Sequence, residues 1–269
     1  TRRLGISNSA ELPSLTLSGA KTLTLTTALN TGSIATTNSN LNTGGNDLTT
    51  GSANTNTTFA GVISGAGKLI KEGSGVFSLS GTNTYSGLTR IDEGTLKISG
   101  SGKLGNGSYS KKIQNSGTFD YASSATQTLS GVISGSGGIT ASGSGALTLT
   151  GTNTFTGAVV LTGGGNLVAG SAAALGANAP AIASGSISDQ FSVSDGVTLA
   201  PLNITGAVRL NSGITTTGRQ NDTSNVLVDA GTINSPVEFT TTNSNINFRG
   251  TLKGQGNAKA RSITINAGT

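Results

Sequence analysis

The sequence predicts an all-β solenoid, in which short strands stack coil upon coil around one narrow core. A 34-residue segment at 61–94 recurs without a gap at 131–164 with 16 identical positions, and self-similarity of this kind is typical of repeat architectures. Within both copies, apolar residues alternate with hydroxyl residues, which is the period-two pattern of a half-buried strand. One such unit cannot bury its apolar face alone, whereas stacked copies can.

The first 60 residues predict two short strands followed by weaker coils. Apolar and hydroxyl side chains alternate over 15–17 and again over 23–25. The polar stretch that follows carries Ile34, Leu41 and Leu48 at spacings of seven. This spacing favours weak coils over a disordered linker.

The two repeats extend over 61–105 and 131–176, and their alternating strands predict the core. We expect a single continuous core to which these strands contribute Phe77, Leu79, Leu147 and Leu149. The second copy has Ala141 where the first has Lys71. We therefore expect that replacing Lys71 costs far less stability than replacing Leu79.

The offset of 70 residues between the copies predicts the size of a coil. Divided by three, it gives about 23 residues per coil, within the range of known solenoid repeats. The chain would then make about eleven or twelve coils and a rod of some 50–60 Å. Asn83 and Asn153 would lie at equivalent corners three coils apart, as would Tyr85 and Phe155. Stacked asparagines at one corner can satisfy each other's amides.

Two intervals interrupt the pattern, and strands resume after each. The Ala/Ser/Gly stretch at 171–188 includes Pro180, which lacks the backbone donor of a strand ladder and suits a corner or an edge. The polar interval at 211–225 is expected to be a loop. Between and after them, strands are predicted from 191–193 to 263–265. No boundary is sharp enough to divide the chain, so 1–269 is predicted to be a single β-solenoid.

The first copy resembles the autotransporter-associated β-strand repeat. Three blocks carry the resemblance in order: G-A-G-K-L-I-K-E-G-S-G from Gly65, L-S-G-T-N-T-Y-S-G-L-T from Leu79, and G-T-L from Gly94. The second copy departs from the pattern at Ala141, Phe155 and Val159. The resemblance implies a right-handed parallel β-helix exported to a Gram-negative cell surface, outer-membrane anchored or released, with a translocator barrel in the full-length protein. It implies no catalytic residues.

Composition excludes several kinds of chemistry. Cys and His are both absent, which removes thiol chemistry, zinc sites of the His/Cys type and the commonest general base. The single adjacent acid pair is Asp92-Glu93; neighbours in a strand point to opposite faces, so the two could act together only on a turn. We therefore predict no catalytic, metal or cofactor site.

The charges are few and unevenly spread. The net charge is +5, yet no Asp, Glu, Lys or Arg occurs between Asp120 and Asp189. Arg249, Lys253, Lys259 and Arg261 form a basic C-terminal group that could attract an anionic surface. We interpret them as solvated charges and predict no nucleic-acid binding, because no aromatic residues are interleaved among them.

These observations favour a non-catalytic cell-surface segment that acts in adhesion, with a host-cell or glycan receptor as its partner. The alternative is a subunit of a self-assembling fibre, because an uncapped coil end is an edge strand that can pair with another chain. A polysaccharide-degrading β-helix enzyme is the weakest of the three hypotheses, since its carboxylates would have to come from Asp92 and Glu93.

Overall fold

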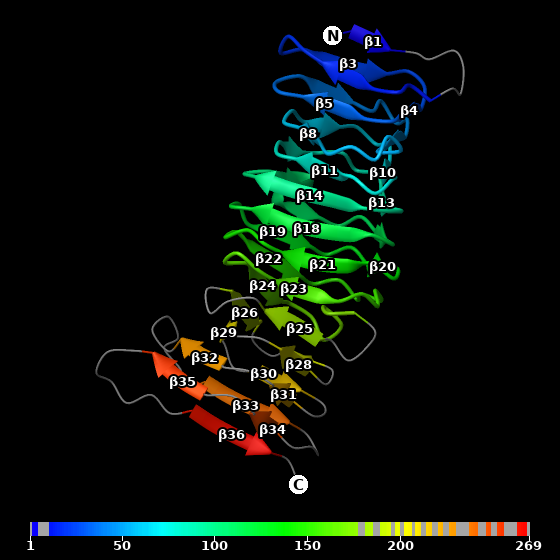
Figure 1. Ribbon diagram of the computed structural model, residues 1–269. Coiled ribbons are helices and arrows are strands. Elements are labelled where there is room, and N and C mark those ends of the chain that lie inside the picture. The colour runs from blue at the N-terminus through cyan, green and yellow to red at the C-terminus, as the bar shows by residue number, and fades with distance from the viewer. Residues whose placement is uncertain are drawn as a thin grey trace.

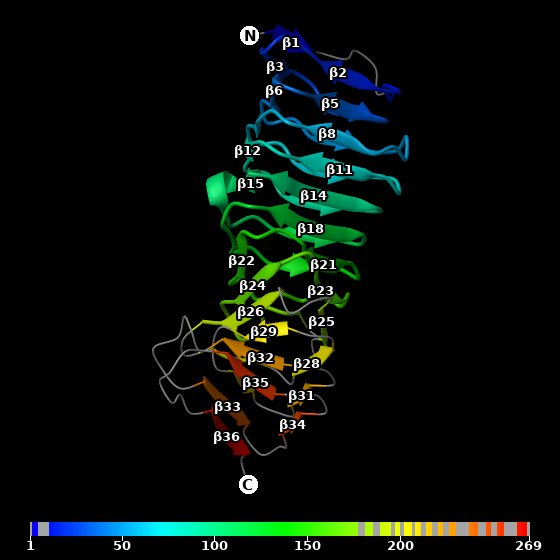
Figure 2. The same cartoon turned by 60° about the vertical axis from the view of Figure 1, so that its left-hand side comes forward.

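The computed structural model confirms the all-β fold: the chain forms a parallel β-solenoid with its N-terminus and C-terminus at opposite ends of the stack (Figures 1 and 2). The structure describes residues 2–4, 11–176, 181–184, 189–194 and 197–199, and from 202 to 267 the strands alone. All strand pairs in the described part of the chain are parallel.

Each coil visits three faces in turn, which we call faces 1, 2 and 3. Face 1 is built by a six-stranded sheet, and near the C-terminus a four-stranded sheet takes the same place in the coil order. The six strands are β4 (Leu29–Thr31), β7 (Leu48–Thr50), β10 (Leu69–Lys71), β13 (Thr89–Ile91), β17 (Ile113–Asn115) and β20 (Ile133–Ser134), and the four are β27 (Thr198–Leu199), β30 (Ile214–Thr216), β33 (Val237–Thr241) and β36 (Ile263–Ala267).

Face 2 is one twelve-stranded sheet that runs the length of the stack. Its strands are β2 (Leu15–Leu17), β5 (Ile34–Thr36), β8 (Thr57–Phe59), β11 (Val76–Leu79), β14 (Thr95–Gly100), β18 (Thr118–Ser123), β21 (Gly138–Ala141), β23 (Val159–Leu161), β25 (Ala181–Ser184), β28 (Leu202–Thr205), β31 (Gln220–Asp222) and β34 (Ile246–Phe248).

Face 3 is divided into three consecutive sheets, and a 3-10 turn, η1 (Gly105–Gly107), lies between β15 and β16. The strands are β1 (Arg2–Leu4), β3 (Thr22–Leu25), β6 (Asn40–Asn42) and β9 (Ile63–Ser64), then β12 (Thr82–Asn83) and β15 (Lys103–Leu104), then β16 (Ser108–Tyr109), β19 (Gln127–Leu129), β22 (Ala146–Leu149), β24 (Asn166–Ala169), β26 (Gln190–Val193), β29 (Val208–Leu210), β32 (Val226–Asp229) and β35 (Leu252–Gln255).

A coil is shorter than the sequence predicted. Over 11–176, where every residue is described, face 2 has eight strands from β2 to β23, so this part of the chain makes about eight turns. Seven steps take Leu15 to Val159, which is about 21 residues per turn. The expected 23 residues per coil is therefore wrong, and the count of eleven or twelve coils that rested on it is not supported.

The interior is a single column of inward-facing side chains. Along β11 and β22 the buried residues alternate with half-buried ones. Phe77, Leu79, Leu147 and Leu149 are all buried in the same hydrophobic cluster, as predicted. Ile34, Leu41 and Leu48 belong to it too, so the polar N-terminal stretch does form coils. Every Phe and Tyr whose side chain the structure describes points inward.

Strands lie within both predicted interruptions. β25 lies within the interval 171–188, and β30 and β31 lie within 211–225, so neither is one continuous loop. Residues 171–175 form a turn. Pro180 lies outside the described residues.

Candidate functional site

Asn83 ties three consecutive coils together from inside a corner. Its side chain is buried, and its Oδ1 accepts the backbone N–H of Ile63, one coil earlier, at 2.9 Å. Its Nδ2 donates to the carbonyl of Gly81 at 2.8 Å and to that of Lys103, one coil later, at 3.3 Å. These bonds satisfy buried backbone groups where the strand ladder is interrupted.

Asn153 does the same in the second repeat. Its Oδ1 accepts the N–H of Ile133 at 2.8 Å, and its Nδ2 donates to the carbonyl of Ala174 at 2.7 Å. Both amides thus bond to backbone. The expected ladder of asparagine on asparagine is wrong, because consecutive coils do not carry asparagine at this corner.

The two repeats nevertheless lie on different faces of the solenoid. β10 and β13 of the first copy are in face 1, while their sequence counterparts β21 and β23 are in face 2. Likewise β11 and β14 are in face 2, and their counterparts β22 and β24 are in face 3. The offset is therefore three coils plus one face. The expectation that Asn83 and Asn153 share one corner is wrong, although their local hydrogen bonds agree.

The expectation that Tyr85 and Phe155 lie at equivalent corners is wrong for the same reason, since the copies are one face apart. Both side chains are buried, but their surroundings differ. The Tyr85 hydroxyl lies 2.7 Å from Thr89 Oγ1, which lies 2.8 Å from the hydroxyl of Tyr109. The two tyrosine rings meet edge to face, with centroids 5.7 Å apart. Tyr109 finally donates to the carbonyl of Gly87 at 2.6 Å. Burial raises the pKa of Tyr109 to about 12 and raises that of Tyr85 well above its usual value.

The second repeat replaces this polar pair with an apolar one. Phe155 takes the place of Tyr85, and Val159 takes the place of Thr89; both are buried. The two departures from the family motif are therefore one coupled change. Removing a hydroxyl together with its partner leaves no buried polar atom unsatisfied.

Lys71 is buried, contrary to expectation. Its residue is 1% exposed, and its Nζ donates to the carbonyls of Glu72 at 2.6 Å, Gly73 at 2.6 Å and Glu93 at 3.3 Å. The amine therefore joins the corners of two successive coils. Burial lowers the pKa of Lys71, an effect that the neighbouring Glu93 and Glu72 oppose.

Ala141 replaces Lys71 beside a large aromatic neighbour. Ala141 pairs in register with Tyr121 of the previous coil, and both are buried. The Tyr121 hydroxyl reaches the carbonyl of Ala125 at the next corner. A bulky tyrosine in one coil thus accompanies a small residue in the next.

Glycines stack between faces 1 and 2 because the coils approach too closely for a side chain. A Cβ on Gly73 would strike the backbone of Gly51, and one on Gly94 would strike that of Gly73. In the following coils, a Cβ on Gly117 would strike the backbone of Gly94, and one on Gly137 would strike that of Gly117. The same kind of close approach to backbone occurs at glycines that the two repeats share, such as Gly61 and Gly131.

The two members of the acid pair have different surroundings. Asp92 follows β13 and accepts from Arg90, through Nε at 3.0 Å and Nη2 at 2.6 Å. Glu93 is exposed, and its backbone carbonyl bonds Lys71. Arg90 and Asp92 line a shallow hollow whose other walls are amides, hydroxyls and a glycine. Within the described part of the chain, no three acidic side chains gather as a metal site would require.

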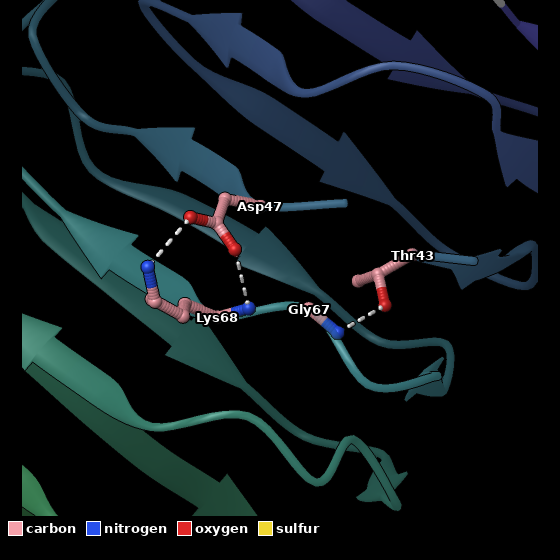
Figure 3. Close-up of polar contacts among 4 residues, drawn as sticks. All are labelled: Thr43, Asp47, Gly67 and Lys68. Carbon is pink, nitrogen blue, oxygen red and sulfur yellow. Dashed lines mark hydrogen bonds and ion pairs between the residues drawn. The ribbon is translucent and has the colours of Figure 1, made fainter. Parts of the chain in front are cut away.

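The outer surface changes character along the stack. In the N-terminal half it carries ion pairs between coils: Lys68 Nζ lies 3.1 Å from Asp47 Oδ2, and the Lys68 backbone N–H donates to Asp47 Oδ1 at 3.0 Å (Figure 3). Close by, Thr43 Oγ1 accepts the N–H of Gly67 at 3.0 Å (Figure 3). Further along the stack, Lys97 Nζ lies 3.1 Å from Asp120 Oδ2.

Beyond Asp120 the described surface as far as residue 176 is uncharged. Its outward positions are hydroxyls, amides and small apolar groups, such as Thr128 and Thr148 on face 3 and Thr140 on face 2. Val132 is the one large apolar side chain among the described residues that is clearly exposed. Of the basic C-terminal group, Arg249, Lys259 and Arg261 lie outside the described residues, and for Lys253 only its place in β35 is described.

The repeats match a known family model, the passenger-associated-transport-repeat, over residues 69–98 and 139–168. A 58-residue stretch of the chain is 45% identical to the adhesin BmaC autotransporter of Brucella suis biovar 1 (strain 1330), a match that covers 22% of this chain and 2% of that protein. No solved structure matches the chain significantly. Among the described residues, no helix is long and apolar enough to span a membrane. The resemblance to an autotransporter passenger repeat is thereby confirmed.

Proposed function

We propose that this chain, which carries two passenger-associated-transport-repeats, is a non-catalytic rod segment of a Gram-negative surface adhesin, outer-membrane anchored or released. The observation that supports it best is the stack of coils around one hydrophobic cluster. Among the described residues, the aromatic side chains and both motif asparagines are buried in its interior. What remains for contact with other molecules is a long outer surface. Its receptor would be a host-cell protein or glycan.

The interior explains why such a segment is stiff. Asn83 and Asn153 each bond the coil before and the coil after, and Lys71 joins two corners. Bending the rod would break bonds of buried groups, which is costly when no water replaces them. We infer that the connections are right-handed, as crossovers between parallel strands almost always are.

The experiment is to measure saturable binding of the purified chain to host cells and to a glycan panel, beside an assay for cleavage of polysaccharides. Saturable binding without product supports the proposal. Reproducible cleavage that the Asp92→Asn or Glu93→Gln variant abolishes would contradict it. Electron microscopy at the same concentrations tests the fibre alternative, which ordered filaments would favour.

A further inference from the structure

One coil is longer than its neighbours and bulges outward. Thr89 pairs with Ile113 across 24 positions, whereas Leu69 to Thr89 and Ile113 to Ile133 each take 20. The extra residues form η1 on face 3, where Asn106 has a left-handed φ of 56°. Figure 2 shows this turn standing out from the side of the stack beside β15.

Three lysines flank the bulge in sequence, and we call them together with η1 the lysine bulge: Lys103 in β15 just before η1, and Lys111 and Lys112 between β16 and β17. Lys111 and Lys112 are exposed, and Lys103 is half-buried. Lys103 leans along the turn, because its Nζ lies 3.9 Å from the position that a Cβ on Gly107 would take. In the described part of the chain, none of the three makes an ion pair, unlike Lys68 and Lys97.

No acid neutralises this surface locally. The nearest acids in sequence are Glu93 and Asp120. Asp120 is already paired with Lys97 at 3.1 Å, and its side chain is 12% exposed. Glu93 lies just after the end of β13, and Lys112 lies just before the start of β17. Because these two strands are parallel neighbours in face 1, the two residues lie at opposite ends of that face. The coil that stacks next, 121–141, has no charge at all. The positive potential of the three lysines is therefore uncompensated.

We propose that the lysine bulge binds acidic polysaccharides, the class in which carboxylate or sulfate groups recur along a hydroxylated chain. A lysine ammonium is a compact charge at the end of a flexible side chain, so separate lysines can each contact one of the acidic groups spaced along such a polymer. Around them, Asn106, Ser108 and Ser110 are exposed and can hydrogen-bond sugar hydroxyls. This inference rests on the proposed adhesin function and names the ligand class.

Other polyanions fit the surface less well. Proteins that hold single-stranded nucleic acid usually offer aromatic rings for base stacking, and every aromatic side chain described here is buried. A membrane surface calls for an apolar face beside the basic one. Here the neighbouring exposed apolar residue is Val132 alone, whose carbonyl accepts the N–H of Ile113.

The repeat supplies an internal comparison. Lys103 corresponds to Ala174 in the second copy, and the segment 171–184 contains no charged residue. The lysines are thus a property of one coil and not of the motif.

The test measures binding of the whole chain to dextran sulfate and polygalacturonate, with neutral dextran as the uncharged probe. The triple variant Lys103→Gln, Lys111→Gln, Lys112→Gln is expected to lose affinity by about tenfold, from three charge contacts of the strength of surface ion pairs. Binding by the parent chain is expected to weaken with added salt. A matched pair of single variants is the control, because both lysines are exposed and neither makes an ion pair among the described residues: Lys111→Gln at the bulge is expected to weaken binding about twofold, and Lys21→Gln far from it is expected to leave binding unchanged.

Several outcomes would overturn the inference. Equal losses in Lys111→Gln and Lys21→Gln would show a general effect of net charge, and no loss in the triple variant would place binding elsewhere. Equal affinity for duplex DNA or for anionic phospholipid vesicles would show that the surface does not select polysaccharide. Cell binding that free dextran sulfate leaves unchanged contradicts this inference alone. Absence of cell binding with intact polysaccharide binding contradicts the proposed adhesin function instead.

Discussion

The hydroxyl of Tyr85 lies 2.7 Å from that of Thr89, inside the solenoid. In the second repeat, neither of the corresponding residues has a hydroxyl group. The pair behaves as a unit because a buried hydroxyl without a partner is more costly than no hydroxyl. The exchange to Phe155 and Val159 keeps the packing and omits the hydrogen bond.

The coupling can be measured by reversing it. Phe155→Tyr alone is expected to destabilise the chain by about 1–3 kcal/mol, because its hydroxyl would be buried beside Val159. Adding Val159→Thr is expected to recover part of that loss, giving a non-additive pair. Urea denaturation of both single variants and the double variant gives the coupling energy. Strict additivity would show that the two sites are independent.

The corner asparagines are expected to be equally important although they lie on different faces. Asn83→Ala and Asn153→Ala each leave a buried isoleucine N–H without its acceptor, at an expected cost of about 1–3 kcal/mol. Thr84→Ala and Thr154→Ala, at exposed neighbours, serve as controls near zero. A large effect at one asparagine and none at the other would mean that the local bond does not determine the stability.

Lys71→Met is expected to destabilise the chain by about 1–3 kcal/mol, since the carbonyls of Glu72, Gly73 and Glu93 lose their donor. For comparison, Leu79→Ala in the apolar core is expected to destabilise the chain by about 2–5 kcal/mol, because it loses buried apolar surface and leaves a cavity. The control is Lys21→Met at an exposed position. If Lys71→Met shifts the urea midpoint no more than this control, the buried amine has no structural role.

The close approach of coils predicts a steric difference between two glycines. Gly61→Ala places a Cβ against the backbone carbonyl of Ser39 and is expected to cost about 1–3 kcal/mol or more. Gly170→Ala meets first a methyl group of Thr150, which can move, so a smaller effect is expected. Neither glycine has a positive φ, so the comparison isolates the contact. Thermal unfolding of the two variants measures it, and equal losses would exclude the backbone clash as the cause.

Stability is expected to fall at alkaline pH. The pKa of Tyr109 is raised to about 12, above its unfolded value of 10.0, so its contribution is complete below pH 10 and is lost as pH rises to about 12. The rise in the pKa of Tyr109 from 10.0 to about 12 corresponds to about 3 kcal/mol of folding free energy. Tyr85 and Tyr121, whose pKa values burial also raises, act in the same direction.

Lys71 acts in the opposite direction. Its pKa in the folded chain is lower than its unfolded value of 10.5, so the folded chain releases this proton more easily and gains stability as the pH rises toward 10.5. The pKa shifts of the three tyrosines all act against that of this one amine. With no Trp in the chain, tyrosinate absorbance reports these groups directly. Ionisation is expected to coincide with loss of strand signal in circular dichroism. Tyrosinate that forms at ordinary pH in the folded chain would contradict the burial.

Alternation and repetition were enough to predict the strands and the core, down to Ile34, Leu41 and Leu48 in the polar stretch. They could not predict the phase of the second repeat, because local sequence determines each corner but not how many corners make a turn. The burial of Lys71 did have a signal. Lys71 stands two residues after Leu69, so the same alternation that places Leu69 inside also places Lys71 inside.

The lysine bulge was missed for a different reason. Its charges are separated by up to nine positions in sequence and are gathered by the 24-residue coil from Thr89 to Ile113. A length difference between coils becomes visible only when strand register is known. For the acid pair, the structure adds what alternation could not give: Asp92 accepts a hydrogen bond from Arg90, and Glu93 is exposed.

An offset of three coils and one face moves a repeated motif both along the rod and around its axis. Any chain that repeated it would set each successive motif a third of the circumference further round, and the fourth would stand above the first after ten coils. The exposed threonines beside each buried asparagine would then trace a shallow spiral stripe. A rod decorated in this way has no preferred side, so it could meet an opposing surface at any rotation about its own axis.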